Sequence, residues 1–225
     1  HLTSSGMEFA SEMVIKATLV DLSRTEVPVT LRPDGRDRPP HLRPWRDGWR
    51  HLRYIFMLSP SWLFFIPSTI FGTIGIIVFL ALILNPNTEM IHIGPFEFGD
   101  HWMVIGGMLM VISHQTLIFG LTTSLYGISE GYRRAGRWLK TIFRVINLES
   151  MMLIGLFTLV IGMLMLIAVF SEWSGAGFGG LNKIREVFGG SMLVLIGLQN
   201  FFGGFLLSIV GGNEASFYTE SGIVK

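Results

Sequence analysis

Four long apolar stretches occupy most of the second part of the chain. They contain no Asp, Glu, Lys or Arg, and they cover residues 62–84, 102–125, 151–170 and 188–210. Each is long enough to cross the hydrocarbon core of a bilayer, which takes about 20 helical residues. The second stretch contains His114 and Gln115, and the fourth contains Gln199 and Asn200. The pattern predicts a mainly α-helical protein with four transmembrane helices.

Shorter patterns precede the first span. Apolar positions recur at helical spacing over residues 6–22, and apolar and polar residues alternate over 25–31, so we expect a helix followed by a short strand. Pro28 would place that strand at the edge of a sheet. A helix and one strand cannot enclose a core, and the chain begins with His1 instead of Met. We therefore expect residues 1–31 to be the end of a larger α/β domain that precedes this chain.

Residues 32–58 combine a basic loop with an amphipathic helix. Three prolines and a glycine predict the loop over 32–42. Residues 43–58 then separate an apolar stripe from a basic one. Indole rings favour the headgroup region and guanidinium groups favour lipid phosphates, so we expect this helix to lie in the membrane interface. Its expected anchors are Trp45, Trp49, Arg46, Arg50 and Arg53.

The connection between the second and third spans is also basic. Its cations are Arg133, Arg134, Arg137, Lys140 and Arg144. We expect it to form a second interfacial helix, with Tyr132, Trp138 and Phe143 at the headgroups. Residues 85–100, in contrast, contain no Lys or Arg. Because basic connections stay on the cytoplasmic side, we expect residues 59–225 to be a multi-pass domain of the cell (inner) membrane, with both termini cytoplasmic.

Composition narrows the chemistry. Hydrophobic residues make up 50% of the 225 residues, the mean hydropathy is +0.53 and the formal net charge is +1. The absence of cysteine excludes disulfides, thiolate metal sites and a cysteine nucleophile. We expect a membrane and no nucleic acid as partners, and a homo-oligomer is compatible with the sequence.

Four sequence motifs follow one another in the first part of the chain. They are Gly6-Met7-Glu8-Phe9-Ala10-Ser11-Glu12-Met13, Glu26-Val27-Pro28-Val29-Thr30-Leu31, Asp34-Gly35-Arg36-Asp37-Arg38 and Trp45-Arg46-Asp47-Gly48-Trp49-Arg50. The series resembles the end of family 2 glycosyltransferases, and most closely the polyprenyl-phosphate (dolichyl-phosphate-type) sugar transferases. In that branch a GT-A catalytic domain ends with such a helix and strand, and a basic loop, interfacial helices and membrane spans follow.

The resemblance implies a reaction. A nucleotide-activated sugar is transferred, with inversion, to the phosphate of a polyprenyl lipid, which is itself the nucleophile. A divalent metal, Mg or Mn, on an Asp-x-Asp motif holds the departing diphosphate. No Asp-x-Asp occurs in this chain. We therefore expect no catalytic residue and no metal ligand here, nucleotide-sugar binding by the preceding domain, and no activity from these residues alone.

The resemblance also implies a site for the acceptor phosphate. The corresponding loop of the family commonly reads Gly-x-Ser-Lys, and Gly35 and Arg36 match its start. Arg38 keeps the charge of the Lys, whereas Asp37 in place of the Ser would repel a phosphate unless an arginine pairs with it. We assign Arg36, Arg38 and Arg43 to the acceptor phosphate, since guanidinium groups bind phosphate oxygens in pairs.

Glu8 and Glu12 lie one helical turn apart in the first motif. Glu12 matches the glutamate of the family helix, which implies a place at the edge of the sugar site. The alternative is that both carboxylates belong to a solvated helix face.

Two other functions are compatible with the same sequence. The chain could be a non-enzymatic four-helix module that binds or translocates polyprenyl-linked sugars or tethers a partner. It could also be a pore or transporter, which would require the polar pairs of the second and fourth spans to face each other across a hydrated path. The simpler interpretation of those pairs is hydrogen bonding between helices.

Overall fold

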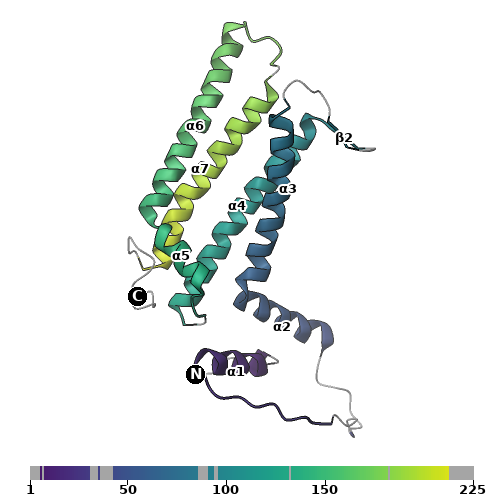
Figure 1. Ribbon diagram of the computed structural model, residues 1–225, viewed down its shortest axis with the longest axis vertical. Helices are drawn as coiled ribbons and strands as arrows, with labels where there is room; N and C mark the ends of the chain where they lie inside the picture. The colour runs from purple at the N-terminus through teal and green to yellow at the C-terminus, as the bar shows by residue number, and fades with distance from the viewer. Residues whose placement is uncertain are drawn as a thin grey trace.

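The computed structural model describes residues 6, 8–30, 35, 43–85, 91–93, 96–131, 133–181 and 183–212. Its elements are nearly all helical (Figure 1). In chain order they are α1 (Glu8–Leu19), α2 (Pro44–Leu58), the π-helix η1 (Ser61–Phe65), α3 (Ile66–Ile83), β1 (Ile91–Ile93), β2 (Phe96–Phe98), α4 (Asp100–Ser129), α5 (Arg137–Val145), α6 (Leu148–Gly175) and α7 (Ile184–Val210).

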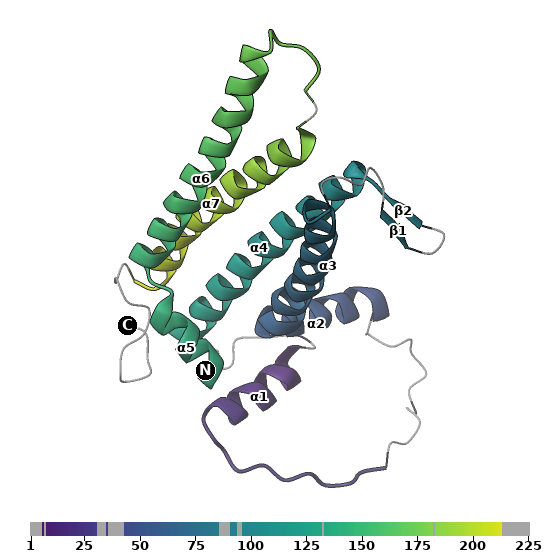
Figure 2. The same ribbon diagram turned by 45° about the horizontal axis from the view of Figure 1, so that its top comes forward.

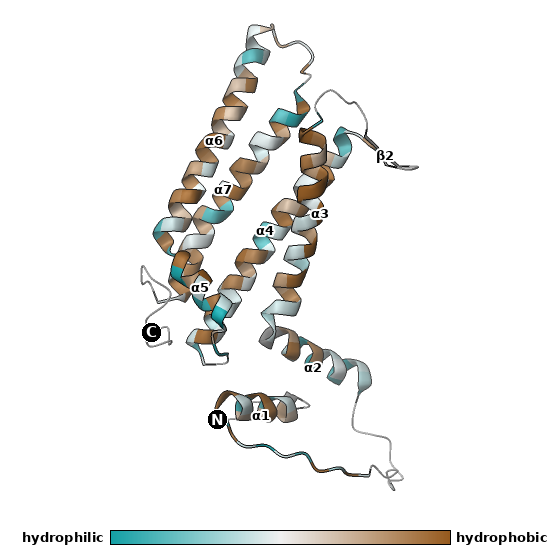
Figure 3. Ribbon diagram, in the orientation of Figure 1, coloured by the Kyte–Doolittle hydropathy of each residue, from teal (hydrophilic) through white to brown (hydrophobic). Residues whose placement is uncertain are grey.

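Four helices are long and apolar enough to cross a membrane, as the sequence predicts. They are Ser61–Ile83, Asp100–Ser129, Leu148–Gly175 and Ile184–Val210. Hydrophobic residues predominate along all four (Figure 3), and many of them are exposed; on α6, for example, Leu153, Phe157 and Leu164 are between 60% and 68% exposed. Apolar surface of this extent needs lipid around it. The structure thus confirms a multi-pass helical membrane protein.

The hairpin of α6 and α7 is held together by glycines. A Cβ added at Gly162 would lie 2.7 Å from the carbonyl oxygen of Gly190, and one added at Gly197 would lie 2.7 Å from the carbonyl oxygen of Gly155. The two backbones are therefore in direct contact. Helices in lipid associate through such close packing, because lipid provides no hydrophobic force between them.

The hairpin of α3 and α4 combines close packing with hydrogen bonds. The hydroxyl of Ser68 donates a hydrogen bond to the backbone carbonyl oxygen of Ser113 at 2.9 Å. In return, the hydroxyl of Ser113 donates to the backbone carbonyl oxygen of Ser68 at 2.7 Å. Near the other end, a Cβ added at Gly75 would lie 2.7 Å from the carbonyl oxygen of Gly106. Reciprocal bonds of this kind satisfy hydroxyl groups that hydrocarbon cannot.

The two hairpins meet at one end of the bundle, where α5 crosses beneath them (Figure 2). The main core cluster lies there and draws on α4, α5, α6 and α7: Leu121, Leu125, Ile128, Leu139, Phe143, Met151 and Leu207.

The amphipathic helix expected between the second and third spans is confirmed as α5, but the headgroup position expected for Phe143 is wrong. Phe143 is only 2% exposed and packs in this core, because α5 turns its apolar face toward the spans. Trp138 stays 47% exposed and stacks edge-on against Phe65, with ring centroids 5.0 Å apart.

The strand expected over 25–31 is not formed. Residues 22–30 make no ladder with any other described residue, and the helix before them is shorter than expected. A strand needs a neighbour for its backbone hydrogen bonds, and the described part of the chain offers none there. A short antiparallel pair occurs elsewhere, between β1 and β2, with Ile91 opposite Phe98. Its sequence signal, alternation on both sides of Gly94-Pro95, was missed.

The glycine contacts lead to a stability prediction. Gly162→Ala puts a methyl group against the backbone of α7 and should lower the free energy of unfolding in detergent by about 2 kcal/mol, since overpacking costs about 1–3 kcal/mol. Gly175→Ala is the matched control, because it makes the same change on the same helix with nothing within 4 Å. The control should be neutral or slightly stabilising. Equal effects in the two variants would contradict backbone contact between α6 and α7.

Candidate functional site

One end of the bundle collects most of the cations on the described residues. We call it the basic end; α1, α2, α5 and the connection between α4 and α5 lie there (Figures 1 and 2). The described cations of α2, of α5 and of the residues beside these two helices are Arg43, Arg46, Arg50, Arg53, Arg133, Arg134, Arg137, Lys140 and Arg144. The opposite end carries the β1–β2 pair and the connection from α6 to α7.

Helix α2 forms as its sequence predicts. Pro44 occupies the first turn, and the carboxylate of Asp47 accepts a hydrogen bond from the backbone N–H of Arg43 at 2.9 Å, which satisfies one free donor of the helix start. Trp45 is 92% exposed and Trp49 is 61% exposed. Arg46 and Arg53 are also exposed, while Arg50 is half-buried. The indoles of Trp45 and Trp49 and the guanidinium groups of Arg46 and Arg53 are therefore exposed where a headgroup layer would lie.

The residues assigned to the acceptor phosphate are only partly covered by the structure. Arg36 and Arg38 lie outside the described residues. Arg43 is the residue that precedes α2, and it is exposed at the basic end. Their grouping therefore stays a prediction.

Glu12 is buried on α1. Its side chain is 3% exposed and one carboxylate oxygen lies 2.5 Å from Nζ of Lys16. The interpretation as a solvated face is thus wrong for Glu12, while the side chain of Glu8 is not described. A buried carboxylate one turn from a lysine can be a structural ion pair or the edge of a site.

Arg134 ties α1 to the connection between α4 and α5. Its Nη2 donates to Oδ2 of Asp21 at 2.7 Å and to the carbonyl oxygen of Leu19 at 2.5 Å. The hydrogen bond from Arg134 lowers the pKa of Asp21, so the carboxylate stays charged to lower pH than usual. The segment that follows α1 is therefore attached to the membrane helices by charge. In the sequence Arg134 is only one charge of a basic run, and nothing there indicates Asp21 as its partner.

Arg185 connects three helices at the opposite end. Its Nε donates to Oδ1 of Asp100 at 2.8 Å, and its Nη1 donates to the carbonyl oxygens of Leu82 at 3.0 Å and Asn85 at 2.8 Å. Arg185 begins α7, Asp100 begins α4, and the two carbonyls end α3. A cation at the end of α3 and an acid at the start of α4 both suit the helix dipoles. No spacing rule in the sequence reveals this pairing, because 85 residues separate the two charges.

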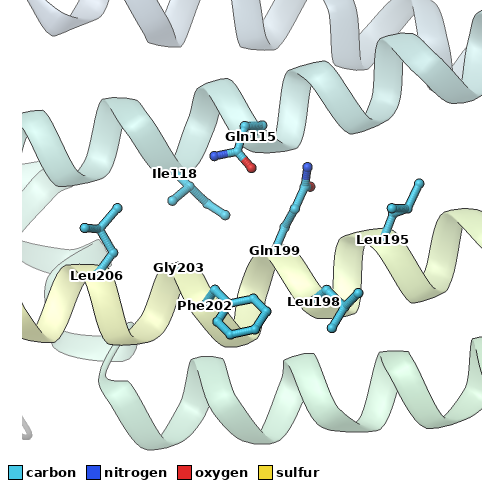
Figure 4. A pocket seen from close by; sticks show the side chains of 8 residues that line it. All are labelled: Gln115, Ile118, Leu195, Leu198, Gln199, Phe202, Gly203 and Leu206. Atoms are coloured by element: carbon cyan, nitrogen blue, oxygen red, sulfur yellow. The ribbon is translucent and has the colours of Figure 1, made fainter.

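Polar side chains meet near the middle of the bundle. Nδ1 of His114 on α4 lies 2.8 Å from Oε1 of Gln199 on α7, which confirms the interpretation as a hydrogen bond between helices. Gln115 and Gln199 line a cavity of about 260 Å³ between the two helices (Figure 4). Asn200 instead faces α6, with its Cβ 3.1 Å from the position of a Cβ at Gly155.

The lining of this cavity bears on the pore hypothesis. Apart from the two glutamines it consists of Gly203 and the apolar side chains Ile118, Leu195, Leu198, Phe202 and Leu206. Such walls do not hold a continuous chain of water. The pore hypothesis requires polar residues of α4 and α7 to face each other, and His114 and Gln199 do so. The residues that line the cavity do not form a hydrated path between them.

Comparisons with known proteins agree with this architecture. Residues 121–211 match the family described as the glycosyltransferase family 2 C-terminal transmembrane region. The chain carries the C-terminal membrane part of a family 2 glycosyltransferase. It is 34% identical over 210 residues to the low-salt glycan biosynthesis hexosyltransferase Agl6 of Haloferax volcanii. The aligned region covers 93% of this chain and 49% of Agl6, so the chain spans about half the length of this curated relative. No solved structure matches it.

Substitution of Arg185 tests the charged contacts that connect α3, α4 and α7. Arg185→Ala removes a mostly buried guanidinium from one carboxylate and two carbonyls, and should lower the free energy of unfolding by about 2 kcal/mol. Lys183→Ala is the control, since Lys183 pairs with the exposed Glu172 at the same end. An exposed pair contributes little, so the control should unfold like the wild type. Equal loss in both variants would refute the role of Arg185 as the connection between α3, α4 and α7.

Proposed function

We propose that this chain is the membrane anchor and acceptor side of an inverting glycosyltransferase that moves a sugar from a nucleotide-sugar to a polyprenyl phosphate. The observation that carries the proposal is the basic end: the cations of α2, α5 and their connections gather where four lipid-exposed helices end. A polyprenyl phosphate has the same two-part chemistry, an apolar chain and an anionic head. The printed name of Agl6, a hexosyltransferase of glycan biosynthesis, supports the reaction class.

In this proposal the loop before α2 holds the acceptor. Arg36, Arg38 and Arg43 neutralise the lipid phosphate and orient one of its oxygens toward the anomeric carbon of the sugar. Trp45 and Trp49 keep α2 at headgroup depth, with Arg46, Arg50 and Arg53 beside the lipid phosphates. Glu12 borders the sugar, since residues 1–31 are proposed to be the end of a GT-A domain.

The donor side belongs to the preceding domain in this proposal. That domain binds the nucleotide-sugar, with a Mg or Mn ion on its Asp-x-Asp motif to hold the departing diphosphate. Among the described residues no three His, Cys, Asp or Glu side chains lie close enough to hold such an ion. We therefore assign no step of the reaction to a metal on this chain.

Orientation follows from the charges. We propose that the basic end faces the cytoplasm and that both termini lie there, in a multi-pass protein of the cell membrane. The side that meets soluble nucleotide-sugars would then be the side that carries Arg36 and Arg38.

Acceptor kinetics test the proposed function. In the full-length protein, Arg36→Ala and Arg38→Ala should each raise the KM for polyprenyl phosphate about 10-fold, because one charge-assisted contact is lost. The KM for the nucleotide-sugar should not change. Arg24→Ala, an exposed cation on the segment before the loop, is the control. Unchanged acceptor kinetics would move the phosphate site elsewhere, and lipid binding without transfer by the full-length protein would favour the non-enzymatic module.

Cysteine labelling tests the orientation. The chain contains no cysteine, so single substitutions report without background from these residues. A membrane-impermeant maleimide should label Gly180→Cys in intact cells and Arg137→Cys only after permeabilisation, since the two positions lie at opposite ends. The reverse pattern would place the basic end outside and would remove the proposed access to nucleotide-sugar.

A further inference from the structure

Arg133 has a half-buried side chain, one nitrogen of which lacks an acceptor among the described residues. Its Nη1 is inaccessible to solvent and has no hydrogen-bond partner among the described residues. The residue lies in the connection between α4 and α5, and its Cβ would be 3.7 Å from a Cβ at Gly127, so the side chain starts against the last turns of α4. Burial lowers the pKa of this guanidinium, which means that the surroundings oppose its charge. Arginine nevertheless stays protonated, so the cost cannot be avoided by losing a proton.

The neighbouring residue shows what a satisfied arginine looks like here. Arg134 has both a carboxylate and a carbonyl as acceptors, from Asp21 and Leu19. Arg133 uses neither, and no ion pair joins it to Glu130 or to the exposed Glu149. A cation with a buried nitrogen that the described residues leave unpaired is an arrangement expected where a ligand brings the anion.

The charges nearby indicate which anion this is. The connection and α5 carry Arg133, Arg134, Arg137, Lys140 and Arg144, against the acids Glu130 and Glu149 at their borders. This excess suits a phosphate monoester, with up to two negative charges, better than a single carboxylate. The place suits a lipid, because α5 lies under the core cluster and Trp138 is packed on Phe65 at the start of the first span. His51 of α2 adds a second buried nitrogen without a described partner at the same end.

We propose that Arg133 binds the phosphate group of a lipid at the basic end, and that this lipid is the polyprenyl phosphate acceptor. The choice of lipid rests on the proposed function. Arg133 would then contact the acceptor from the side of the membrane helices. A phosphate oxygen accepts hydrogen bonds from Nη1, and the buried charge is neutralised on binding. The apolar chain of the same lipid would extend along the outward faces of the spans.

Binding measurements on the full-length protein test this assignment without requiring catalysis. The protein is placed in nanodiscs of phosphatidylcholine and titrated with polyprenyl phosphate, with the phosphate-free polyprenol, or with phosphatidic acid as an ordinary lipid phosphate. Arg133→Gln should weaken binding of polyprenyl phosphate at least 10-fold and leave binding of polyprenol unchanged. Arg133→Lys should recover part of the loss. Arg137→Gln removes the cation at the first residue of α5 and should change binding less than 2-fold.

A stability measurement separates binding from folding. In phosphatidylcholine nanodiscs without an added phosphate monoester, Arg133→Gln should unfold at the same temperature as the wild type or a higher one, because it removes an uncompensated charge. Polyprenyl phosphate should raise the unfolding temperature of the wild type and not that of the variant. If Arg133→Gln instead lowers stability and leaves lipid binding intact, the partner is a carboxylate of the preceding domain and the assignment is overturned.

The remaining outcomes are also decisive. Equal dependence on Arg133 for phosphatidic acid and polyprenyl phosphate would keep the phosphate site but overturn its assignment to the acceptor. Sugar transfer that is unaffected in Arg133→Gln would overturn the inference and leave the proposed function standing. Arg133-dependent binding of polyprenyl phosphate, with no transfer by the wild type, would support this site and reject the proposed function.

Discussion

Helix association inside hydrocarbon is the constraint on which this structure depends. Lipid gives apolar helices no reason to leave it, so the spans must be held by close contact and by hydrogen bonds between them. Both hairpins meet this need in different ways. Gly162 and Gly197 bring the backbones of α6 and α7 together, and Ser68 and Ser113 exchange hydrogen bonds between α3 and α4.

The contact between the hairpins is of another kind. At the basic end it is a conventional apolar core that includes Leu125, Phe143 and Leu207, and at the opposite end it is the ion pair of Arg185 with Asp100. Between these ends α4 and α7 also pack closely: a Cβ added at Gly107 would lie 2.9 Å from Sδ of Met192, and one added at Gly203 would lie 3.0 Å from Cδ1 of Ile118. His114 and Gln199 form a polar contact between the same two helices, beside the cavity. The joint between the hairpins therefore combines apolar packing along α4 and α7 with the core cluster and the ion pair at its two ends.

Sequence alone predicted the elements whose pattern is local. The four spans and the amphipathic helices follow from composition and helical period, since lipid and interface act on each segment separately. Features that depend on distant partners were missed or wrong. The strand over 25–31 has no neighbour, Phe143 turns inward because the spans receive it, and Arg185 finds an acid 85 residues away. For the candidate site, the sequence identified the cations but not which of them would be buried.

Burial is what separates the cations of the basic end into different roles. Arg46 is exposed and suits attraction to an anionic surface, which needs no fixed geometry. Arg134 is exposed but has its charge paired with the carboxylate of Asp21. Nη1 of Arg133 is inaccessible to solvent and has no acceptor among the described residues, which is why we propose that a lipid phosphate compensates its charge. An unpaired charge lowers the stability of the free protein, and a ligand phosphate that pairs with it stabilises the complex. A protein can retain such a charge where the ligand is a substrate. By this argument the residue that stabilises the free protein least is the one that would recognise the lipid head most strongly.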